Sequence, residues 1–391
     1  MKINFIGGFF PENKLSEFVE NSNGEVHYAA NSLQQSIISG LERFDNVDLL
    51  LITAPFLENY PSYNKIFIKG EKTDTCHIAP FINLKLIDTF SKTYSLRRII
   101  KSEVPNNPND EAILIYGMFD YFLKSIPEDY KNKVCLVIPD LPRMMGGDLT
   151  KLKVKLYIKY IENVIKRHLH KVDCFVFISK HMKDFISIED RPWIVVEGIY
   201  NNLQKIEPQQ KELNTTILYT GTLDKRYGIL DLLKAFSLVS DANFRLWICG
   251  EGAGKEDVKL SALKDDRIKY YGQIPNEEVL KLQRRATILI NPRKNDKEYT
   301  RFSFPSKTME YLASGTPTIM YKLDGVPEEY YDYFFSPKDN SVESLKNIIL
   351  EVAAFSQVKR YAFGMKAQEF VLQNKNPKIQ VGKILEMINQ I

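Results

Sequence analysis

Short apolar runs rich in β-branched residues alternate along the chain with longer stretches in which apolar residues recur at three- and four-residue steps. This alternation is typical of parallel β-sheets covered by helices on both faces. In the first half of the chain, the apolar periodicity predicts helices over Ala29–Leu41 and Leu152–Leu169. The strands expected in that half are Lys2–Ile6, Asp48–Thr53, Ile113–Tyr116, Val134–Ile138, Cys174–Ile178 and Ile194–Val196.

A polar stretch, residues 200–214, contains Pro208 and interrupts the alternation, so we expect it to be a linker. Beyond it the pattern starts again. The strands expected there are Thr216–Tyr219, Phe244–Ile248, Ile268–Tyr271, Ile288–Ile290 and Thr318–Tyr321, and the helices are Leu230–Phe236, Asn276–Arg284 and Ser306–Ala313. The chain is therefore expected to be an α/β protein of two doubly wound, Rossmann-like domains, residues 1–200 and 214–377. Such domains would face a central cleft and bind ligands outside the carboxyl ends of their strands.

The composition agrees with two packed domains. A length of 391 residues with 44% hydrophobic residues is enough to bury a core in each of them. The 53 Lys and Arg nearly balance the 49 Asp and Glu, so the net charge of +4 does not argue for a polyanionic partner. Nucleic-acid-binding motifs are also missing, so no nucleic-acid partner is expected.

The cysteines and the first residues bear on the cellular compartment. The four cysteines are far apart and show no C-x-x-C or C-x-x-H spacing, which argues against disulfides and zinc sites and favours the cytoplasm. Met1–Phe10 is expected to be a strand rather than a signal peptide, because Pro11–Lys14 follows where small residues would precede a cleavage site. No run reaches the roughly 18 apolar residues that a membrane span needs, so any membrane contact should be peripheral.

The segment from residue 291 to residue 317 carries the strongest indication of a binding site. Pro305 suits the first turn of a helix, Ser303 could cap it, and Gly315 with Pro317 would end it, which predicts a short helix over Pro305–Ser314.

The free amides near Phe304, Ser306 and Lys307 would bind an anion such as a phosphate, with added charge from Lys307, Arg293 or Arg301. Glu310 would lie close enough to accept hydrogen bonds from ribose hydroxyls. A diphosphate beside a ribose indicates a nucleotide, although an ordinary capped helix with a solvated face is the alternative.

Two glycine-containing turns could complete such a site. After one expected strand, the amides of Gly221 and Thr222 could face a phosphate, with Lys225 or Arg226 screening its charge. Gly7 and Gly8 follow the first strand, where missing side chains would let a ligand approach the backbone.

These residues belong to longer strings, and with them the sequence resembles bacterial GT-B glycosyltransferases of glycosyltransferase family four. The resemblance covers nearly the whole chain. The strings that carry it are the first glycine loop, Gly221-Thr222-Leu223, Cys249-Gly250-Glu251-Gly252, Tyr271-Gly272-Gln273-Ile274, Phe304-Pro305-Ser306-Lys307 and Glu310-Tyr311-Leu312-Ala313-Ser314-Gly315-Thr316-Pro317.

The resemblance implies a division of labour. Residues 1–200 would bind the acceptor, residues 214–377 would bind a sugar nucleotide, and a final helix, residues 378–391, would pack back on the first domain. Asp140 and Glu310 are the candidate catalytic residues, and Gly7, Gly8 and Asp120 are candidates for the acceptor side. The candidate donor-binding residues are Gly8, Gly221, Thr222, Lys225, Arg226, Gly250, Gln273, Ile274, Arg293, Ser303, Phe304, Ser306, Lys307 and Glu310.

The sequence departs from the family pattern at three places. The first of the family's paired glutamates falls on Phe302, so only Glu310 remains. The Arg and Lys of the diphosphate loop fall on Thr222 and Tyr227. The His of a His-Asp pair falls on Pro139, which leaves Asp140 without an imidazole.

The implied reaction moves a sugar, with retention, from a nucleotide-diphosphate sugar, a UDP-sugar, to a hydroxyl of a bacterial surface glycan or lipid-linked glycan at the inner face of the membrane. No D-x-D triplet occurs, so no metal and no other cofactor is expected. Two alternatives stay open. One is a catalytically silent sugar-nucleotide-binding subunit of a partner transferase, and the other is a GT-B nucleotide-sugar epimerase or hydrolase.

A basic segment suggests a membrane contact. Between residues 148 and 171, apolar side chains interleave with seven cations, which fits either an anionic membrane surface or a solvated helix face. The cations are Lys151, Lys153, Lys155, Lys159, Lys166, Arg167 and Lys171, against Asp148 and Glu162. A second cluster, Lys92, Arg97, Arg98 and Lys101, favours an anionic acceptor or membrane.

Overall fold

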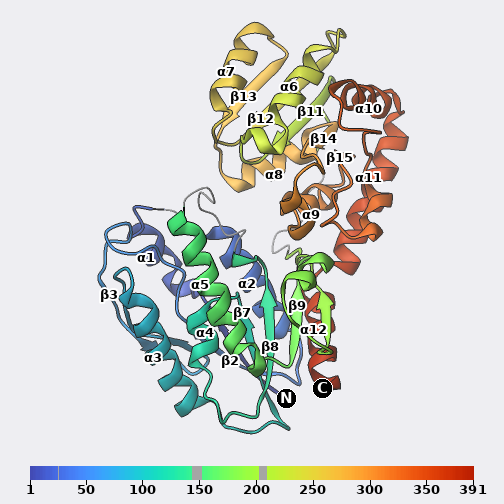
Figure 1. Ribbon diagram of the computed structural model, residues 1–391. Helices are drawn as coiled ribbons and strands as arrows, with labels where there is room; N and C mark the ends of the chain where they lie inside the picture. The colour runs from blue at the N-terminus through green and yellow to red at the C-terminus, as the bar shows by residue number, and fades with distance from the viewer. Residues whose placement is uncertain (25, 143–151, 202–208) are drawn as a thin grey trace. The chain divides into compact units, whose positions relative to one another are not determined.

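The computed structural model describes residues 1–24, 26–142, 152–201 and 209–391, without the side chains of Lys153 and Tyr157. The chain divides into two compact units, of which the first combines Met1–Ile199 with Pro377–Ile391 and the second is Tyr200–Asn376 (Figure 1). Each unit has its own sheet and its own buried core.

The first unit is built on an eight-stranded sheet in the order β10-β9-β8-β7-β1-β2-β5-β4. The pairs are parallel except for the antiparallel edge pair of β4 and β5. Every residue of the central strand β7 is buried, as its unbroken apolar run requires. The strands are β1 (Lys2–Gly7), β2 (Asp48–Thr53), β4 (Glu71–Lys72), β5 (Cys76–Ile78), β7 (Glu111–Tyr116), β8 (Lys133–Ile138), β9 (Cys174–Phe177) and β10 (Trp193–Val195).

Helices cover both faces of this sheet. On one face α2 packs against α12, and Gly40 allows the close approach, because a Cβ there would lie 2.3 Å from Val381. In a second helical layer α3 packs on α4 and α4 on α5, with α4 and α5 in front of β7 and β8 in Figure 1. The helices are α1 (Leu15–Glu20), α2 (Tyr28–Leu41), α3 (Ile87–Glu103), α4 (Asp120–Ser125), α5 (Leu152–His168) and α12 (Pro377–Gln390). A separate two-stranded antiparallel sheet pairs β3 (Phe67–Ile68) with β6 (Phe81–Ile82).

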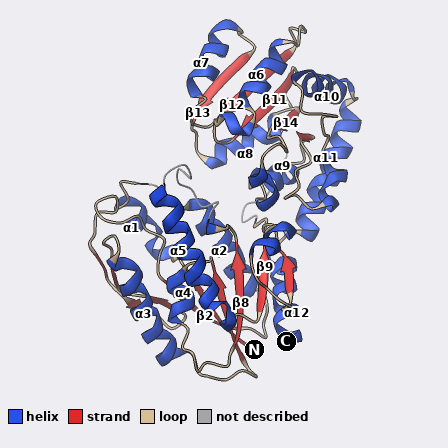
Figure 2. Ribbon diagram, viewed as in Figure 1, coloured by secondary structure: helices blue, strands red, loops and turns tan. Residues whose placement is uncertain are grey.

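The second unit is a five-stranded parallel sheet in the order β13-β12-β11-β14-β15, so its central strands end at the same edge (Figure 2). Its strands are β11 (Thr215–Thr220), β12 (Phe244–Cys249), β13 (Ile268–Gly272), β14 (Ile288–Asn291) and β15 (Thr318–Met320). Its helices are α6 (Ile229–Ser237), α7 (Lys255–Lys264), α8 (Asn276–Arg285), α9 (Lys307–Ala313), α10 (Val342–Ala354) and α11 (Gln357–Asn374).

The predicted α/β class with two doubly wound sheets is confirmed, and each expected strand and helix lies within two residues of an observed one. The first sheet carries one antiparallel pair at its edge, β4 with β5. Only residues 73–75 join β4 to β5, and so short a connection permits a hairpin but no parallel crossover. No helix in the described parts of the chain is long and apolar enough to cross a membrane.

Candidate functional site

The segment after β14 folds into a 3-10 helix, Glu298–Phe302, followed by α9. The predicted helix over Pro305–Ser314 is shortened to seven residues, because Pro305 and Ser306 form only the turn that leads into it, with the Thr308 amide donating to the Pro305 carbonyl at 2.9 Å. Gly315, at φ 74°, and Pro317 follow its end, as predicted. A helix this short offers little dipole, so its side chains matter more than its axis.

Ser303 does not cap α9. Its hydroxyl donates to the Tyr299 carbonyl at 3.1 Å and accepts from Nη2 of Arg293 at 2.8 Å. The prediction of a Ser303 cap is therefore wrong. The serine orients an arginine instead.

Glu310 is held by two donors that share one of its carboxylate oxygens. Nζ of Lys307 lies 2.7 Å from Oε1, and Nε2 of Gln283 donates to the same atom. Among the described residues, Oε2 has no hydrogen-bond partner. One oxygen of Glu310 is thus fixed and the other is open to a ligand.

Gln283 and Tyr311 join Glu310 to the end of β11. Gln283 is completely buried on α8, and its Nε2 also donates to Oγ1 of Thr220 at 3.2 Å. The Tyr311 hydroxyl accepts from the Thr220 amide at 2.8 Å. Sequence reasoning assigned no role to Gln283, Tyr311 or Thr220. The available signal was a glutamine on the otherwise apolar face of α8, beside Val279 and Leu282.

At this edge of the sheet, the turn after β11, which contains Gly221, contacts the turn after β12, which contains Gly250, through the two backbones. A Cβ on Gly250, at φ 132°, would lie 1.8 Å from the Gly221 carbonyl oxygen. The Gly221 amide donates to the Cys249 carbonyl at 3.1 Å, so the expectation that it faces a phosphate is not met. The Thr222 amide makes no hydrogen bond within the described residues, and Thr222 is exposed.

Two of the predicted phosphate-screening cations are already neutralised. Nζ of Lys225 lies 3.4 Å from Asp257, and Nη2 of Arg226 lies 2.7 Å from Asp224. The hydrogen bond to Asp224 raises the pKa of Arg226 above its ordinary value. These ion pairs compensate the charge that the sequence assigned to an incoming anion.

Arg293, at the carboxyl end of β14, has no such partner. Its guanidinium lies 5.2 Å from the ring centroid of Tyr227 and 4.7 Å from that of Tyr299, and among the described residues no carboxylate lies within ion-pair distance of it. Its Nε is buried without a hydrogen-bond partner in the described parts of the chain. Burial raises the pKa of the Tyr219 hydroxyl, and the nearby positive charge of Arg293 partly offsets that rise. The same hydroxyl donates to the Thr222 carbonyl at 2.8 Å. The arginine is therefore fixed beside the Thr222 turn.

Lys307 completes the group of charges. Burial raises the pKa of the Cys249 thiol to about 12, and the positive charge of Lys307 partly offsets that rise. Lys307 therefore lies near the end of β12. The edge thus brings together the Thr222 amide, Arg293, Lys307 and the open oxygen of Glu310.

The remaining donor-side candidates surround this edge or pack beneath it. Phe304 packs on Tyr330 with ring centroids 5.3 Å apart, and Ile274 packs on the small core of Trp247. Ser306 and Gln273 are exposed.

Gly7 and Gly8 have a packing role in the first unit. A Cβ on Gly7 would lie 2.2 Å from Oε1 of Gln34, and one on Gly8 would lie 2.1 Å from the ring of Phe56. The Gly8 amide donates to Oε1 of Gln34 at 2.8 Å. The space expected for a ligand is therefore filled by side chains of the same unit.

Asp140 and Asp120 follow neighbouring strands of the first unit. Asp140 is water-accessible, yet the surrounding protein removes part of its solvation and raises the pKa of the carboxyl to about 6. Burial raises the pKa of Tyr116 at the end of β7, and the nearby charge of Asp140 raises it further. The two side chains therefore share this edge of the sheet. Asp120 pairs with Lys124 at 2.7 Å.

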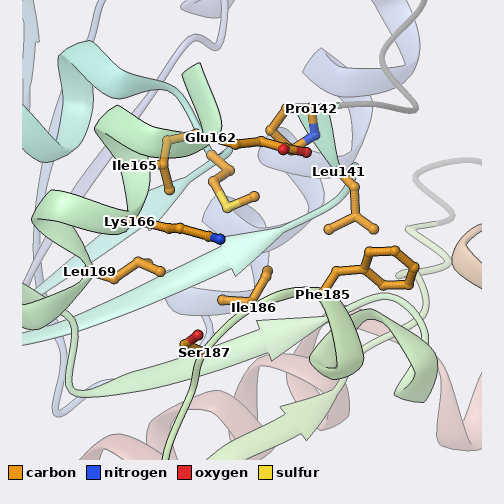
Figure 3. Close-up of a pocket in the computed structure, with 10 residues that line it drawn as sticks. Leu141, Pro142, Glu162, Ile165, Lys166, Leu169, Phe185, Ile186 and Ser187 are labelled. Atoms are coloured by element: carbon orange, nitrogen blue, oxygen red, sulfur yellow. The ribbon is translucent and has the colours of Figure 1, made fainter. Parts of the chain in front are cut away.

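A small cavity of about 50 Å³ is lined in part by Leu141 and Pro142, which follow Asp140 in the chain (Figure 3). Its wall is mostly apolar, and Lys166 extends its ammonium into it from α5. The lining residues are Met118, Leu141, Pro142, Glu162, Ile165, Lys166, Leu169, Phe185, Ile186 and Ser187. In the described residues, no group of three or more His, Cys, Asp or Glu side chains is placed to hold a metal ion.

In each of the two predicted basic clusters, the structure turns one lysine away from the solvent. On α5, Lys155, Lys159, Lys166 and Arg167 are exposed. Lys171, in the turn after α5, has a side chain that is only 6% exposed and pairs with Glu128 at 2.7 Å. Asp148 and Lys151, and the side chain of Lys153, lie outside the described residues.

On α3, Lys92 points inward. It repeats with Leu96 and Ile100 along the buried face, pairs with Asp88 at 3.4 Å and lies over the rings of Phe81 and Tyr121. Assigning Lys92 to a surface cluster was therefore wrong.

Comparisons with known proteins agree with this architecture. Residues 201–380 match the family described as Glycosyl transferases group 1. A search of curated protein sequences finds no match.

Solved structures share the fold across the whole chain. The lipopolysaccharide outer core galactosyltransferase WaaB is 15% identical, with a TM-score of 0.62 over 100% of this chain and 99% of that one. HepE of Anabaena, solved in complex with UDP, is 13% identical, with a TM-score of 0.63 over 100% of both chains. Trehalose-6-phosphate synthase OtsA is 10% identical, with a TM-score of 0.66 over 100% of this chain and 99% of that one. Both sheets therefore belong to a GT-B fold.

Proposed function

We propose that this chain is a group 1 glycosyltransferase that moves a sugar, with retention, from a UDP-sugar to a hydroxyl of a bacterial surface glycan or lipid-linked glycan. The second unit would bind the donor, and the first unit, together with α12, would bind the acceptor. HepE in complex with UDP supports the choice of a uridine nucleotide.

The observation that carries the proposal is the set of charges at the carboxyl edge of the five-stranded sheet. Ligands of open parallel sheets bind at this edge. Arg293, which has no carboxylate partner in the described parts of the chain, and the Thr222 amide suit a diphosphate, whose oxygens accept hydrogen bonds from both.

Glu310 suits the ribose. Lys307 and Gln283 fix Oε1, so Oε2 can accept hydrogen bonds from a diol. A carboxylate that is already oriented loses little conformational freedom when it binds.

Catalysis then follows from where charge develops. As the bond between the sugar and the diphosphate breaks, negative charge grows on the leaving oxygen, and Arg293 and Lys307 would stabilise it. The first unit would hold the acceptor hydroxyl beside the anomeric carbon on the face that the diphosphate leaves, because attack from the opposite face would invert the configuration. Asp140, whose pKa is about 6, is the proposed partner of that hydroxyl, and it would be ionised at neutral pH.

One observation favours a second function, that of a silent sugar-nucleotide-binding subunit. The position of the family's first glutamate holds Phe302, which is buried, so a second carboxylate is missing there. A silent subunit would bind the nucleotide but release no product from any acceptor.

The test is a thermal-shift screen with UDP, GDP, dTDP and ADP and their sugars, comparing the wild type with Glu310→Ala. A ligand at 100 times its dissociation constant adds about 2.7 kcal/mol to the free energy of unfolding. We expect a shift with UDP that Glu310→Ala loses, and sugar transfer by the wild type in the presence of EDTA. Binding without transfer or donor hydrolysis would instead indicate a silent subunit, and no shift with any nucleotide would contradict the donor site.

A further inference from the structure

The α3 helix, labelled in Figure 1, and the neighbouring two-stranded sheet of β3 and β6 belong to the first unit. Together they carry a patch of exposed apolar side chains. Its seven large side chains are each at least 38% exposed, and Leu86, Phe90 and Tyr94 exceed 70%. The members of this apolar patch are Ile66, Phe67, Ile82, Leu86, Ile87, Phe90 and Tyr94. They are neighbours, because Phe67 lies opposite Ile82 in the two-stranded sheet and α3 packs on β6. Patches of this kind on a folded surface mark interaction sites.

The backbone at Leu86 adds a second observation. Leu86 lies at the N-terminus of α3 with φ 73° and ψ −28°, a conformation that bulky residues rarely adopt. Its side chain is 74% exposed, so this backbone brings it no packing in the described structure. Strain that is maintained without a gain in packing points to a role at the surface.

The charges of α3 continue the patch along the helix. Beyond Phe90 and Tyr94, the next turns expose Arg97, Arg98 and Lys101, and none of the three has an ion-pair partner in the described residues. The acidic residues of α3 behave differently, because Asp88 pairs with Lys92 and Glu103 with Lys72. The exposed surface is therefore apolar at one end and cationic at the other.

We propose that this surface docks on an anionic lipid membrane. The apolar patch would enter the boundary of the acyl chains, Tyr94 would lie at headgroup depth, and Arg97, Arg98 and Lys101 would meet lipid phosphates. A second copy of the chain fits less well, because its α3 would offer these three cations no free carboxylate: Asp88 pairs with Lys92 and Glu103 with Lys72. The proposal goes beyond the proposed function and does not depend on the donor site.

The test is sedimentation of the full chain with vesicles of phosphatidylcholine, alone or with roughly one third phosphatidylglycerol. We expect the wild type to pellet with the anionic vesicles and not with phosphatidylcholine alone. Phe90→Ser with Tyr94→Ser should weaken binding by at least about tenfold. Replacing Arg97, Arg98 and Lys101 by Gln should weaken it and flatten its dependence on salt.

The matched control is Leu156→Ser with Tyr160→Ser on α5, an exposed pair with the same spacing beside Lys155 and Lys159. Loss of vesicle binding in this control, with none in the α3 variant, would overturn the proposal. So would a wild type that stays in solution with anionic vesicles.

Two further measurements separate the remaining explanations. Every variant should keep the UDP-induced thermal shift, which excludes unfolding and keeps this test apart from that of the donor site. If sedimentation velocity shows that the α3 variant turns a dimer into a monomer while vesicle binding persists, a second copy covers the patch and the membrane proposal is wrong.

Discussion

Single residues in the candidate donor site differ in whether their charge is already satisfied. Arg226 and Lys225 pair with carboxylates, whereas Arg293 lies against two tyrosine rings and a serine hydroxyl. All three are cations that follow strands of the same expected sheet, so the sequence could not rank them. The ranking depends on Asp224 and Asp257, whose distances to these cations only the fold defines.

Asp140 gives a pH-dependent prediction at this scale. Its pKa is about 6 in the folded protein against an ordinary value of 3.8, so the ionised carboxylate destabilises the folded state above pH 6. Below about pH 4 the carboxyl is protonated in both states and contributes nothing. Asp140→Asn should therefore raise the melting temperature at pH 7 to 8, and the gain should vanish by about pH 4.

The measurement is a series of melting curves from pH 4 to pH 8. Asp120→Asn is the control, because it removes an ion pair with Lys124 and should bring no gain at neutral pH. A gain for Asp140→Asn that stays constant with pH would contradict the account.

Secondary-structure elements were predictable where burial follows a simple period. Strands such as β7 are buried on both faces and stand out as apolar runs. The α3 helix was missed because its exposed face carries Phe90 and Tyr94 while its buried face carries Lys92, which blurs the apolar stripe. The α7 helix was missed because it buries only Val258.

The contact between the β11 and β12 turns gives a prediction at the scale of elements. Gly250→Ala would place a methyl group 1.8 Å from the Gly221 carbonyl oxygen, so the turns must separate. We expect a loss of roughly 1–3 kcal/mol in the free energy of unfolding, together with weaker nucleotide binding. Urea unfolding and UDP titration measure the two effects.

Gly272→Ala is the matched control for that change. Gly272 also has a positive φ, 69°, but a Cβ there meets nothing within 4 Å, so only backbone strain is added. Equal losses of UDP affinity in the two variants would show that the contact between the turns does not shape the site.

The whole molecule combines two units whose architecture the sequence predicted and whose sites it predicted unevenly. The family string at α9 pointed to Lys307 and Glu310, because such a string preserves residue types at fixed spacing, and the two side chains lie 2.7 Å apart. Sequence reasoning could not find Gln283, which reaches Glu310 from another helix. It also assigned a ligand to Gly7 and Gly8, where the fold places Phe56 and Gln34.

The central claim is that the carboxyl edge of the five-stranded sheet binds the diphosphate of a sugar nucleotide through Arg293. Calorimetric titration of UDP into the wild type, Arg293→Ala and Arg226→Ala tests it most directly. The account predicts a loss of at least about tenfold in affinity, or about 1.4 kcal/mol, for Arg293→Ala, and little change for Arg226→Ala, whose charge is held by Asp224. Unchanged binding in Arg293→Ala, or a larger loss in Arg226→Ala, would contradict it.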